Sequence, residues 1–317
     1  MKPEQLARIY KQMVTMRRFE EAVASGVSSG QIHGEMHLGI GQESVAAVLA
    51  QYLRPEDAVV STHRAHLHAL AHGVDPVELL AEIFERDGLN HGKGGHMHLF
   101  DPRRQFMCTG IVGAGAPIAT GYALAQRLRG EEAVTVAVSG DGAMNQGAVF
   151  EAMNLAMVRG LPILFLVEDN GYSISVPRAR STAGALADRA TSLGMQARGC
   201  DGRDVEETDA VIGALMTRVR SRRAPAMAVA RVYRFRGHYE GDLDLYRPSG
   251  EKEQAMSSAE DPLQRARDRL MDLGAGEMRL QGLEKEAAED VARWLATALR
   301  RPEPDVRAAR EGVLADA

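Results

Sequence analysis

The stretch of sequence that decides the fold is residues 140–172, GDGAMNQGAVFEAMNLAMVRGLPILFLVEDNGY. An apolar run at residues 133–138 precedes it, and a second apolar run, residues 163–167, lies near its end. The segment between the two runs has the pattern of a helix that Gly160 and then Pro162 bring to an end. In a strand–helix–strand unit the two strands are parallel, so the polar residues that follow each strand lie at the same edge of the sheet.

Polar side chains follow both of these predicted strands. Asp141 comes after the first, and Asn170 comes after the second. Carboxylate and amide oxygens are ligands that suit octahedral Mg²⁺, which phosphate oxygens and water complete. Gly140 and Gly142 let the backbone approach a ligand closely, and the predicted helix start offers free N–H groups to a phosphate. The pattern predicts a Mg²⁺–diphosphate site, and the alternative is an ordinary turn with a solvated aspartate.

The composition is that of a globular chain. At 317 residues, with 45% hydrophobic residues, the chain has the size of a large α/β enzyme, and we expect one domain over residues 1–317. The net charge of −5 argues against a nucleic-acid-binding protein. Two cysteines make no disulfide framework, which favours a reducing compartment. No apolar run approaches the roughly 20 residues of a membrane span. The first residues resemble neither a signal nor a transit peptide, so we expect a cytoplasmic protein.

Predicted strands and helices alternate along the chain. This alternation predicts a doubly wound α/β fold with a parallel sheet and a helical C-terminal extension from about residue 259. The further expected helices are 3–25, 42–53, 76–87, 117–129 and 204–220, the further strands are 58–60 and 226–232, and the long loops are 25–41 and 88–116. A loop as long and as rich in glycine and histidine as 88–116 is expected to be functional.

The histidines are the second signal. Nine of the ten lie between residues 33 and 98, and the tenth is His238. Zinc is one interpretation, but no His-Glu-x-x-His motif and no paired cysteines occur. We expect most of the loop histidines to make structural hydrogen bonds, namely His33, His37, His72 and His91. Residues 61–68, STHRAHLH, differ because they follow a predicted strand and contain Arg64, whose planar guanidinium can bind two diphosphate oxygens.

Residues 112–121, VGAGAPIATG, begin like a dinucleotide-binding fingerprint. The sixth position is Ile118, however, and no acidic residue ends a strand about twenty residues later. The GxxxxGK[ST] phosphate-binding loop is also absent. We therefore expect no nicotinamide cofactor on this chain.

Taken together, these motifs resemble the alpha subunit of the thiamin-diphosphate-dependent component of 2-oxo acid and acetoin dehydrogenase complexes. The resemblance rests on GDGA-NQG and the second polar turn, on THR at 62–64, on GKGGHMH at 92–98, on GIVG at 110–113 and on RFRGHY at 234–239. The chain has Asp169 in the second polar turn, where the family usually has asparagine, and Ala65 and Leu67, where the family has glycines.

The resemblance implies a role for each matching residue. The Mg²⁺ ligands would be Asp141, Asn170 and the main-chain carbonyl of Tyr172. The cofactor would also meet Gly142, Ala143 and Arg64 at its diphosphate and the backbone of Gly110 and Val112 at its aminopyrimidine ring. His238 would face the reacting carbonyl, where imidazole can carry a proton near neutral pH, and His63 would join it as a catalytic residue in contact with the cofactor.

The resemblance further implies the reaction and its partners. A carbon–carbon bond next to a carbonyl would be cleaved on the cofactor, and the acyl group would pass to a lipoyl group on an acyltransferase. The chain would be active only with a beta subunit, in an α2β2 heterotetramer, and alone it would expose the apolar face that the partner covers. Tyr239 replaces the serine that animal pyruvate enzymes phosphorylate, so we expect no kinase control there.

The substrate and two other function classes stay open. His63 and residues 240–242, EGD, favour acetoin over pyruvate, a branched 2-oxo acid or the substrate of a specialised carboligase. A Mg²⁺-dependent phosphoryl-transfer enzyme could use Asp141 and Asn170, but no second phosphate motif accompanies them. A non-catalytic scaffold subunit would have no reason to retain these two residues together with Arg64 and His238.

Overall fold

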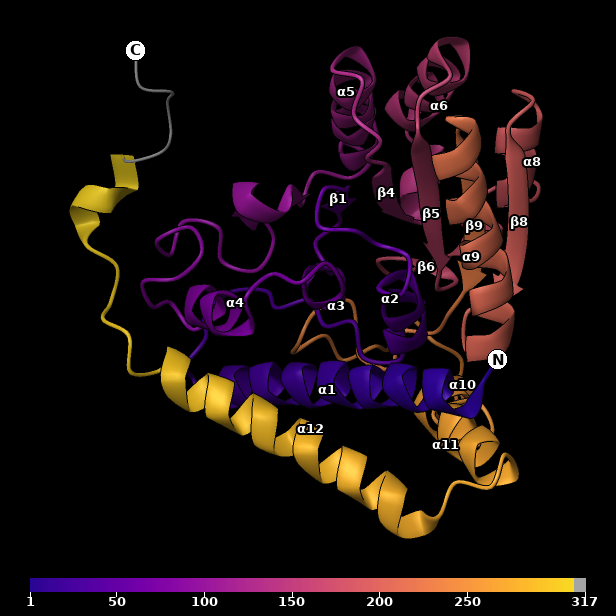
Figure 1. The fold of residues 1–317 in the computed structure, drawn as a ribbon. Helices are drawn as coiled ribbons and strands as arrows, with labels where there is room; N and C mark the ends of the chain where they lie inside the picture. The colour runs from indigo at the N-terminus through magenta and orange to yellow at the C-terminus, as the bar shows by residue number, and fades with distance from the viewer. Residues whose placement is uncertain (311–317) are drawn as a thin grey trace.

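The computed structural model describes residues 1–310, and its centre is a seven-stranded sheet (Figure 1). The strand order is β2-β3-β1-β4-β5-β9-β8, and every neighbouring pair is parallel except β2–β3. The strands are β1 (Ala58–Ser61), β2 (Phe100–Asp101), β3 (Phe106–Cys108), β4 (Thr135–Gly140), β5 (Ile163–Asp169), β8 (Gln196–Asp201) and β9 (Ala226–Arg231). A separate hairpin pairs β6 (Tyr172–Ser173) with β7 (Val176–Pro177). The predicted doubly wound α/β fold is confirmed.

Helices cover both faces of the sheet. They are α1 (Pro3–Ser28), α2 (Glu43–Leu49), α3 (His66–Ala71), α4 (Pro76–Ile83), α5 (Gly115–Leu128), α6 (Gly147–Arg159), α7 (Arg178–Ser181), α8 (Leu186–Thr191), α9 (Val205–Arg222), α10 (Glu251–Ala255), α11 (Pro262–Asp272) and α12 (Glu277–Ala298). Short 3₁₀ turns are η1 (Pro102–Arg104), η2 (Gly142–Asn145) and η3 (Val306–Arg310).

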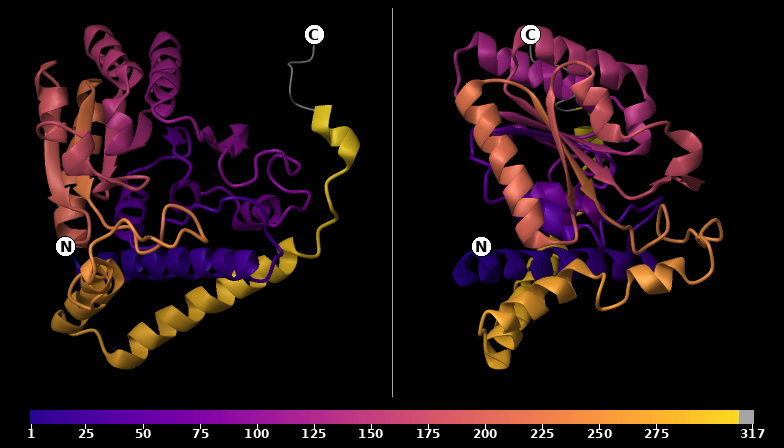
Figure 2. Two further views of the ribbon diagram at one scale, coloured as in Figure 1. Left: turned by 180° about the vertical axis from the view of Figure 1, so that it is seen from behind. Right: turned by 90° about the vertical axis from the view of Figure 1, so that its right-hand side faces the viewer.

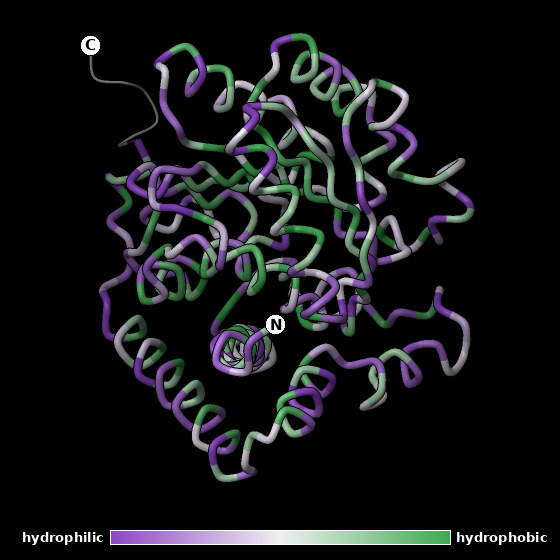
Figure 3. Tube along the Cα trace, turned by 45° about the vertical axis from the view of Figure 1, so that its right-hand side comes forward, coloured by the Kyte–Doolittle hydropathy of each residue, from purple (hydrophilic) through white to green (hydrophobic). Residues whose placement is uncertain are grey.

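The central strands are apolar along their whole length because both of their faces are buried. Leu164 and Leu166 of β5 pack into a core shared with α1, α2 and α9, whereas Ile163 and Phe165 pack into a second core shared with α5, α6 and α8. Hydropathy colouring shows that green, hydrophobic segments gather in the interior of the molecule (Figure 3). The alternation of side chains along a strand therefore places one core on each side of the sheet.

The strand–helix–strand unit predicted from residues 140–172 is present. In it, β4 and β5 are parallel, and Gly140 lies opposite Glu168. Helix α6 ends at Gly160, whose φ of +58° is the left-handed conformation that glycine adopts without strain. The two polar segments after the strands therefore lie at one edge of the sheet.

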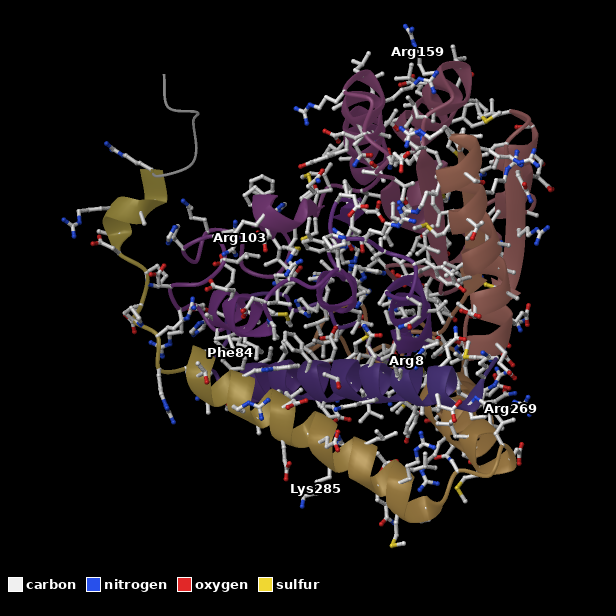
Figure 4. The ribbon with its side chains drawn as sticks, in the orientation of Figure 1. Arg8, Phe84, Arg103, Arg159, Arg269 and Lys285 are labelled. Carbon is white, nitrogen blue, oxygen red and sulfur yellow. The ribbon has the colours of Figure 1, made fainter. Side chains whose placement is uncertain are left out.

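The N-terminal and C-terminal helices pack against each other below the sheet (Figures 1 and 2). Helix α1 is 26 residues long and buries apolar side chains such as Leu6, Met13 and Phe19. Helix α12 runs along it and buries Leu280 and Val291, while Lys285 points away from α1 (Figure 4). Of the helices described in residues 1–310, none is long and apolar enough to cross a membrane.

Several elements differ from the expectation. Strand β8 was not predicted because its residues Ala197–Gly199 do not form an apolar run, since β8 lies at the edge of the sheet. The stretch 88–116 contains β2, η1 and β3, which are too short to leave a periodic pattern. The 42–53 and 76–87 helices end earlier, at Leu49 and Ile83. After Asp141 the chain forms η2 before α6 begins, so the helix does not start directly behind the GDG motif.

Candidate functional site

One pocket brings the predicted site residues together. Its volume is about 460 Å³, and it lies at the carboxyl ends of β1, β4 and β5. All ten residues predicted to bind the cofactor or metal line this pocket: His63, Arg64, Gly110, Val112, Asp141, Gly142, Ala143, Asn170, Tyr172 and His238. They come from five separate segments, and the parallel sheet brings them together at a single edge.

Asp141 lies in the pocket with a buried and unsatisfied carboxylate. The residue is 1% exposed, and its Oδ2 atom has no hydrogen-bond partner within the chain. Burial, and secondarily the carboxylate of Asp169, raises the pKa of Asp141 to about 6. An ionised carboxylate in such a place is stabilised by a cation, and the donor set of Asp141 with the Asn170 amide suits Mg²⁺. The pocket therefore fits the predicted metal.

The two glycines of the GDG motif keep the floor of the pocket open. A Cβ atom added at Gly142 would lie 2.1 Å from Oγ of Ser173, so no larger residue fits there without a rearrangement. Oγ of Ser173 is itself buried without a partner. A narrow place lined by unpaired polar groups and backbone is suited to a diphosphate.

The second polar turn, residues 169–172, is held by a hydrogen bond between a side chain and the backbone of the turn itself. Oδ1 of Asn170 accepts a hydrogen bond from the Tyr172 N–H at 3.1 Å, and Gly171 has a φ of +81°. Asp169, which replaces the family's asparagine, turns to the Nε atom of Arg178 at 3.5 Å. The substitution thus adds a negative charge near Asp141 but leaves Asn170 in the pocket.

Arg64 is buried, and its guanidinium faces the His238 loop. Nη1 donates to the Leu38 carbonyl at 2.6 Å, and Nη2 donates to the His238 carbonyl and lies 3.3 Å from His238 Nδ1. Arg64 was predicted to bind the diphosphate. In the structure all of the hydrogen bonds of its guanidinium go to protein groups, so its role at the diphosphate stays a prediction.

The loop that carries His238 is tightly hydrogen-bonded. Oδ2 of Asp242 accepts from the His238 N–H at 2.6 Å and from the Tyr246 hydroxyl at 2.9 Å. Tyr246 also accepts from Nη2 of Arg234 at 2.6 Å. The loop is therefore ordered by its own side chains before any ligand arrives.

Two arginines determine which ring nitrogen of His238 carries the hydrogen. Arg64 and Arg234 lie 3.3 and 3.4 Å from Nδ1, and since a guanidinium can only donate, Nδ1 is an acceptor. Burial, followed by these two positive charges, lowers the pKa of His238 to about 4. His238 is thus neutral at pH 7, with its single hydrogen on Nε2.

A cluster of imidazoles surrounds His238. The centroid of the His37 ring lies 4.6 Å from that of His63 and 4.8 Å from that of His238, and both contacts are edge-on. One nitrogen atom from each of the three rings lies within 4.8 Å of the other two. His96 is hydrogen-bonded to His37 at 3.0 Å. Sequence reasoning treated His37 as a loop residue and gave His96 no role. The glycine-rich loop motif around His96 was the one signal of its importance.

The other loop histidines are structural, as expected. Nε2 of His72 lies 2.9 Å from the Asp57 carbonyl, whereas His33 and His91 lie at exposed positions beside Glu85 and Asp87. Both cysteines, Cys108 and Cys200, are buried and free.

Apolar side chains surround the mouth of the pocket. Ile111, Val112 and Ile174 line the pocket and are 67%, 54% and 58% exposed. Leu243 and Leu245, which follow His238 in the chain, are 79% and 84% exposed but do not line the pocket. An apolar rim of this kind is typical of a surface that a partner covers.

Comparison with known proteins gives one consistent result. Residues 11–307 match the family model of the dehydrogenase E1 component. The alpha subunit of acetoin:2,6-dichlorophenolindophenol oxidoreductase from Cupriavidus necator is 40% identical over 251 residues, which are 78% of this chain and 75% of that protein. The pyruvate dehydrogenase E1 alpha subunits of Zymomonas mobilis and Rhizobium meliloti are 37% and 38% identical, over 95% and 94% of this chain and 86% and 87% of theirs.

Proposed function

The chain belongs to the dehydrogenase E1 component family, and from this premise we propose that it is the alpha subunit of a thiamin-diphosphate-dependent dehydrogenase. In this proposal the enzyme cleaves the carbon–carbon bond next to a carbonyl, with acetoin as the favoured substrate. The observation that carries it is the pocket itself, in which an unpaired buried carboxylate and a neutral, donor-bearing imidazole face the same space.

The cofactor site is assigned from the residues that fit it. Mg²⁺ would be held by Asp141, Asn170 and the carbonyl of Tyr172, and the diphosphate would lie along Gly142 and Ala143. Support comes from the unsatisfied Oδ2 of Asp141 and from the absence of a side chain at Gly142, which lies close to Ser173. When bound, thiamin diphosphate supplies the carbon nucleophile and the electron sink for the cleavage.

His238 acts in this proposal as a hydrogen-bond donor. Its Nε2–H is the hydrogen that Arg64 and Arg234 leave free, since both occupy Nδ1. A neutral imidazole can give a hydrogen bond to the oxygen of the substrate carbonyl and so stabilise the negative charge that develops there. The His63 ring lies beside it, with the two ring centroids 5.4 Å apart, and both residues line the pocket.

A beta subunit is the proposed partner. The relatives are named as alpha subunits, and the apolar rim around the pocket supports a partner that covers this mouth. We further propose the α2β2 heterotetramer and a lipoyl-bearing acyltransferase as acceptor of the acyl group. The buried free thiols of Cys108 and Cys200 favour a reducing compartment, the cytoplasm.

Acetoin is favoured over pyruvate by His63 and by residues 240–242. In the structure the Glu240 N–H donates to the Met36 carbonyl at 2.7 Å, so residues 240–242 lie next to the segment that contains His37. A 2-oxo acid is the second candidate, and since 2-oxo acids that differ by a methylene are distinguished by only about 1–3 kcal/mol, pyruvate and the branched 2-oxo acids are both tested.

The test is turnover by the complex with its beta subunit. Reduction of 2,6-dichlorophenolindophenol would be followed with acetoin, pyruvate and 3-methyl-2-oxobutanoate, with and without thiamin diphosphate and Mg²⁺. We expect cofactor-dependent reduction, fastest with acetoin. Preference for a 2-oxo acid would refute the substrate assignment alone, whereas a cofactor-loaded complex without turnover would refute the dehydrogenase assignment.

The metal assignment has its own test. The Asp141→Ala complex is expected to lose thiamin diphosphate binding in calorimetric titration, while its circular dichroism spectrum stays that of the wild type. A matched control is Asp209→Ala, which removes a carboxylate that contacts Tyr52 far from the pocket lining. Unchanged binding by the Asp141 variant would refute the metal site.

A further inference from the structure

A buried pair of histidines lies behind the two imidazoles of the pocket. Nδ1 of His37 and Nε2 of His96 are 3.0 Å apart, and the two residues are 4% and 7% exposed. His37 then meets His63 and His238 through edge-on ring contacts. His96 touches neither of these two rings in any recorded contact, and it is absent from the pocket lining. The contact that joins His96 to the rings of the pocket is therefore its hydrogen bond to His37.

The backbone around His37 is already fixed from both sides. Arg64 donates to the carbonyl of Leu38, and the Gly39 N–H donates to Oε1 of the buried Glu20 at 3.0 Å. The Glu240 N–H donates to the carbonyl of Met36. With the main chain held in this way, the remaining freedom of His37 is the rotation of its side chain, which is restrained by the hydrogen bond to the His96 ring and by a hydrogen bond to the backbone of Glu35.

The loop that carries His96 is also fixed. Oε1 and Oε2 of Glu82, a fully buried residue, accept from the N–H groups of Gly94 at 2.8 Å and of Gly92 at 3.0 Å. The Cys108 thiol lies 3.9 Å from the carbonyl of His96. His96 is thus a rigid support, and a rigid hydrogen-bond partner can select one orientation of the ring that it contacts.

We propose that His96 is a positioning residue of this enzyme, which orients the His37 ring through their hydrogen bond and thereby aligns His63 and His238 for the reaction. Burial lowers the pKa of both His37 and His96 to about 3, so both rings are neutral at pH 7. A neutral imidazole has one N–H and one acceptor nitrogen, so the direction of this single bond also decides whether Nε2 of His37 presents a hydrogen or a lone pair to its neighbours. The proposal rests on the proposed function, since the reaction provides one of its two readouts.

The first readout is turnover by the complex with the beta subunit, saturated with thiamin diphosphate and Mg²⁺. For His96→Leu we expect kcat with acetoin to fall by about tenfold or more, while KM changes by less than about twofold, because positioning acts on the transition state. His96→Gln keeps a donor and an acceptor and should recover most of the lost kcat. His33→Leu, an exposed histidine outside the pocket, is the matched control and should behave as the wild type.

The second readout does not need turnover. In a crystal structure of the His96→Leu complex, the His37 ring should leave its edge-on contacts with His63 and His238, whereas in His96→Gln it should keep them. A His37 ring that stays in place in the leucine variant would overturn the proposal, and so would equal kcat losses in the two variants. A wild-type complex that turns over none of the substrates would refute the proposed function, and the ring positions would then decide the role of His96 independently.

Discussion

Replacing Asp141 by asparagine is expected to stabilise the cofactor-free complex while removing its response to the cofactor. Burial and the neighbouring Asp169 raise the pKa of Asp141 from 3.8 to about 6. Above pH 6 the carboxyl is ionised in both the folded and the unfolded chain, and the charge is less favourable in the folded one. At about 1.4 kcal/mol per pKa unit, the raised pKa lowers the free energy of unfolding by up to about 3 kcal/mol. Asparagine carries no charge but leaves a buried amide unpaired, so we expect a net gain of about 1–2 kcal/mol at pH 8.

The raised pKa of Asp141 also predicts how the difference in stability between variant and wild type changes with pH. Below the unfolded pKa of 3.8 the carboxyl is protonated in both states, so the loss is absent; it grows as the pH rises and is complete above about pH 6. The assay is thermal unfolding of the complex at pH 5 and pH 8, with and without thiamin diphosphate and Mg²⁺. The variant should melt higher than the wild type at pH 8 without cofactor, by a smaller margin at pH 5, and should not respond to the cofactor. A lower melting temperature at pH 8, or equal margins at the two pH values, would refute the reasoning.

Three further changes test other parts of the structure. Asp169→Asn should shift the pH dependence of cofactor binding to lower pH in calorimetric titrations, because it removes a charge that raises the pKa of the metal-binding carboxyl; an unchanged profile would contradict this. Gly142→Ala should weaken cofactor binding by about tenfold or more, because its Cβ would lie 2.1 Å from Oγ of Ser173, and Ser173→Gly in the same chain should restore part of the affinity. Arg220→Ala should lower the free energy of unfolding by about 3 kcal/mol in denaturant titrations, because it leaves the fully buried Asp57 without its 2.6 Å ion pair, and cofactor affinity should stay unchanged.

The part of the pocket that we propose for Mg²⁺ and diphosphate was predictable because it is local in the sequence. Asp141 and Asn170 belong to one strand–helix–strand unit, and the geometry of parallel strands alone brings them to the same edge. The apolar runs that form β4 and β5 are buried on both faces, so their pattern is unambiguous. Edge strand β8 lacks such a pattern, and it was missed for that reason.

The histidine half could be predicted only in part. His63 and His238 were found through the motifs around them, but their contact with His37 joins three loops that are distant in the sequence. The hydrophobic periodicity of the sequence does not indicate contacts between loops that are distant in the chain. The hydrogen bonds of Arg64 to Leu38 and His238 could not be predicted either, because they join segments that are distant in the sequence.

The hydrogen bonds that join residues 36–40 to residues 235–240 also determine the order in which the site can form. The Phe235 N–H donates to the Ile40 carbonyl and the Glu240 N–H to the Met36 carbonyl, across about two hundred residues of chain. Closing so long a loop is slow compared with the folding of a local unit, and during synthesis the later segment does not yet exist. The segments that contribute the GDG turn and the second polar turn are therefore synthesised before the His238 loop, and the hydrogen bonds that join this loop to residues 36–40 can form only after them.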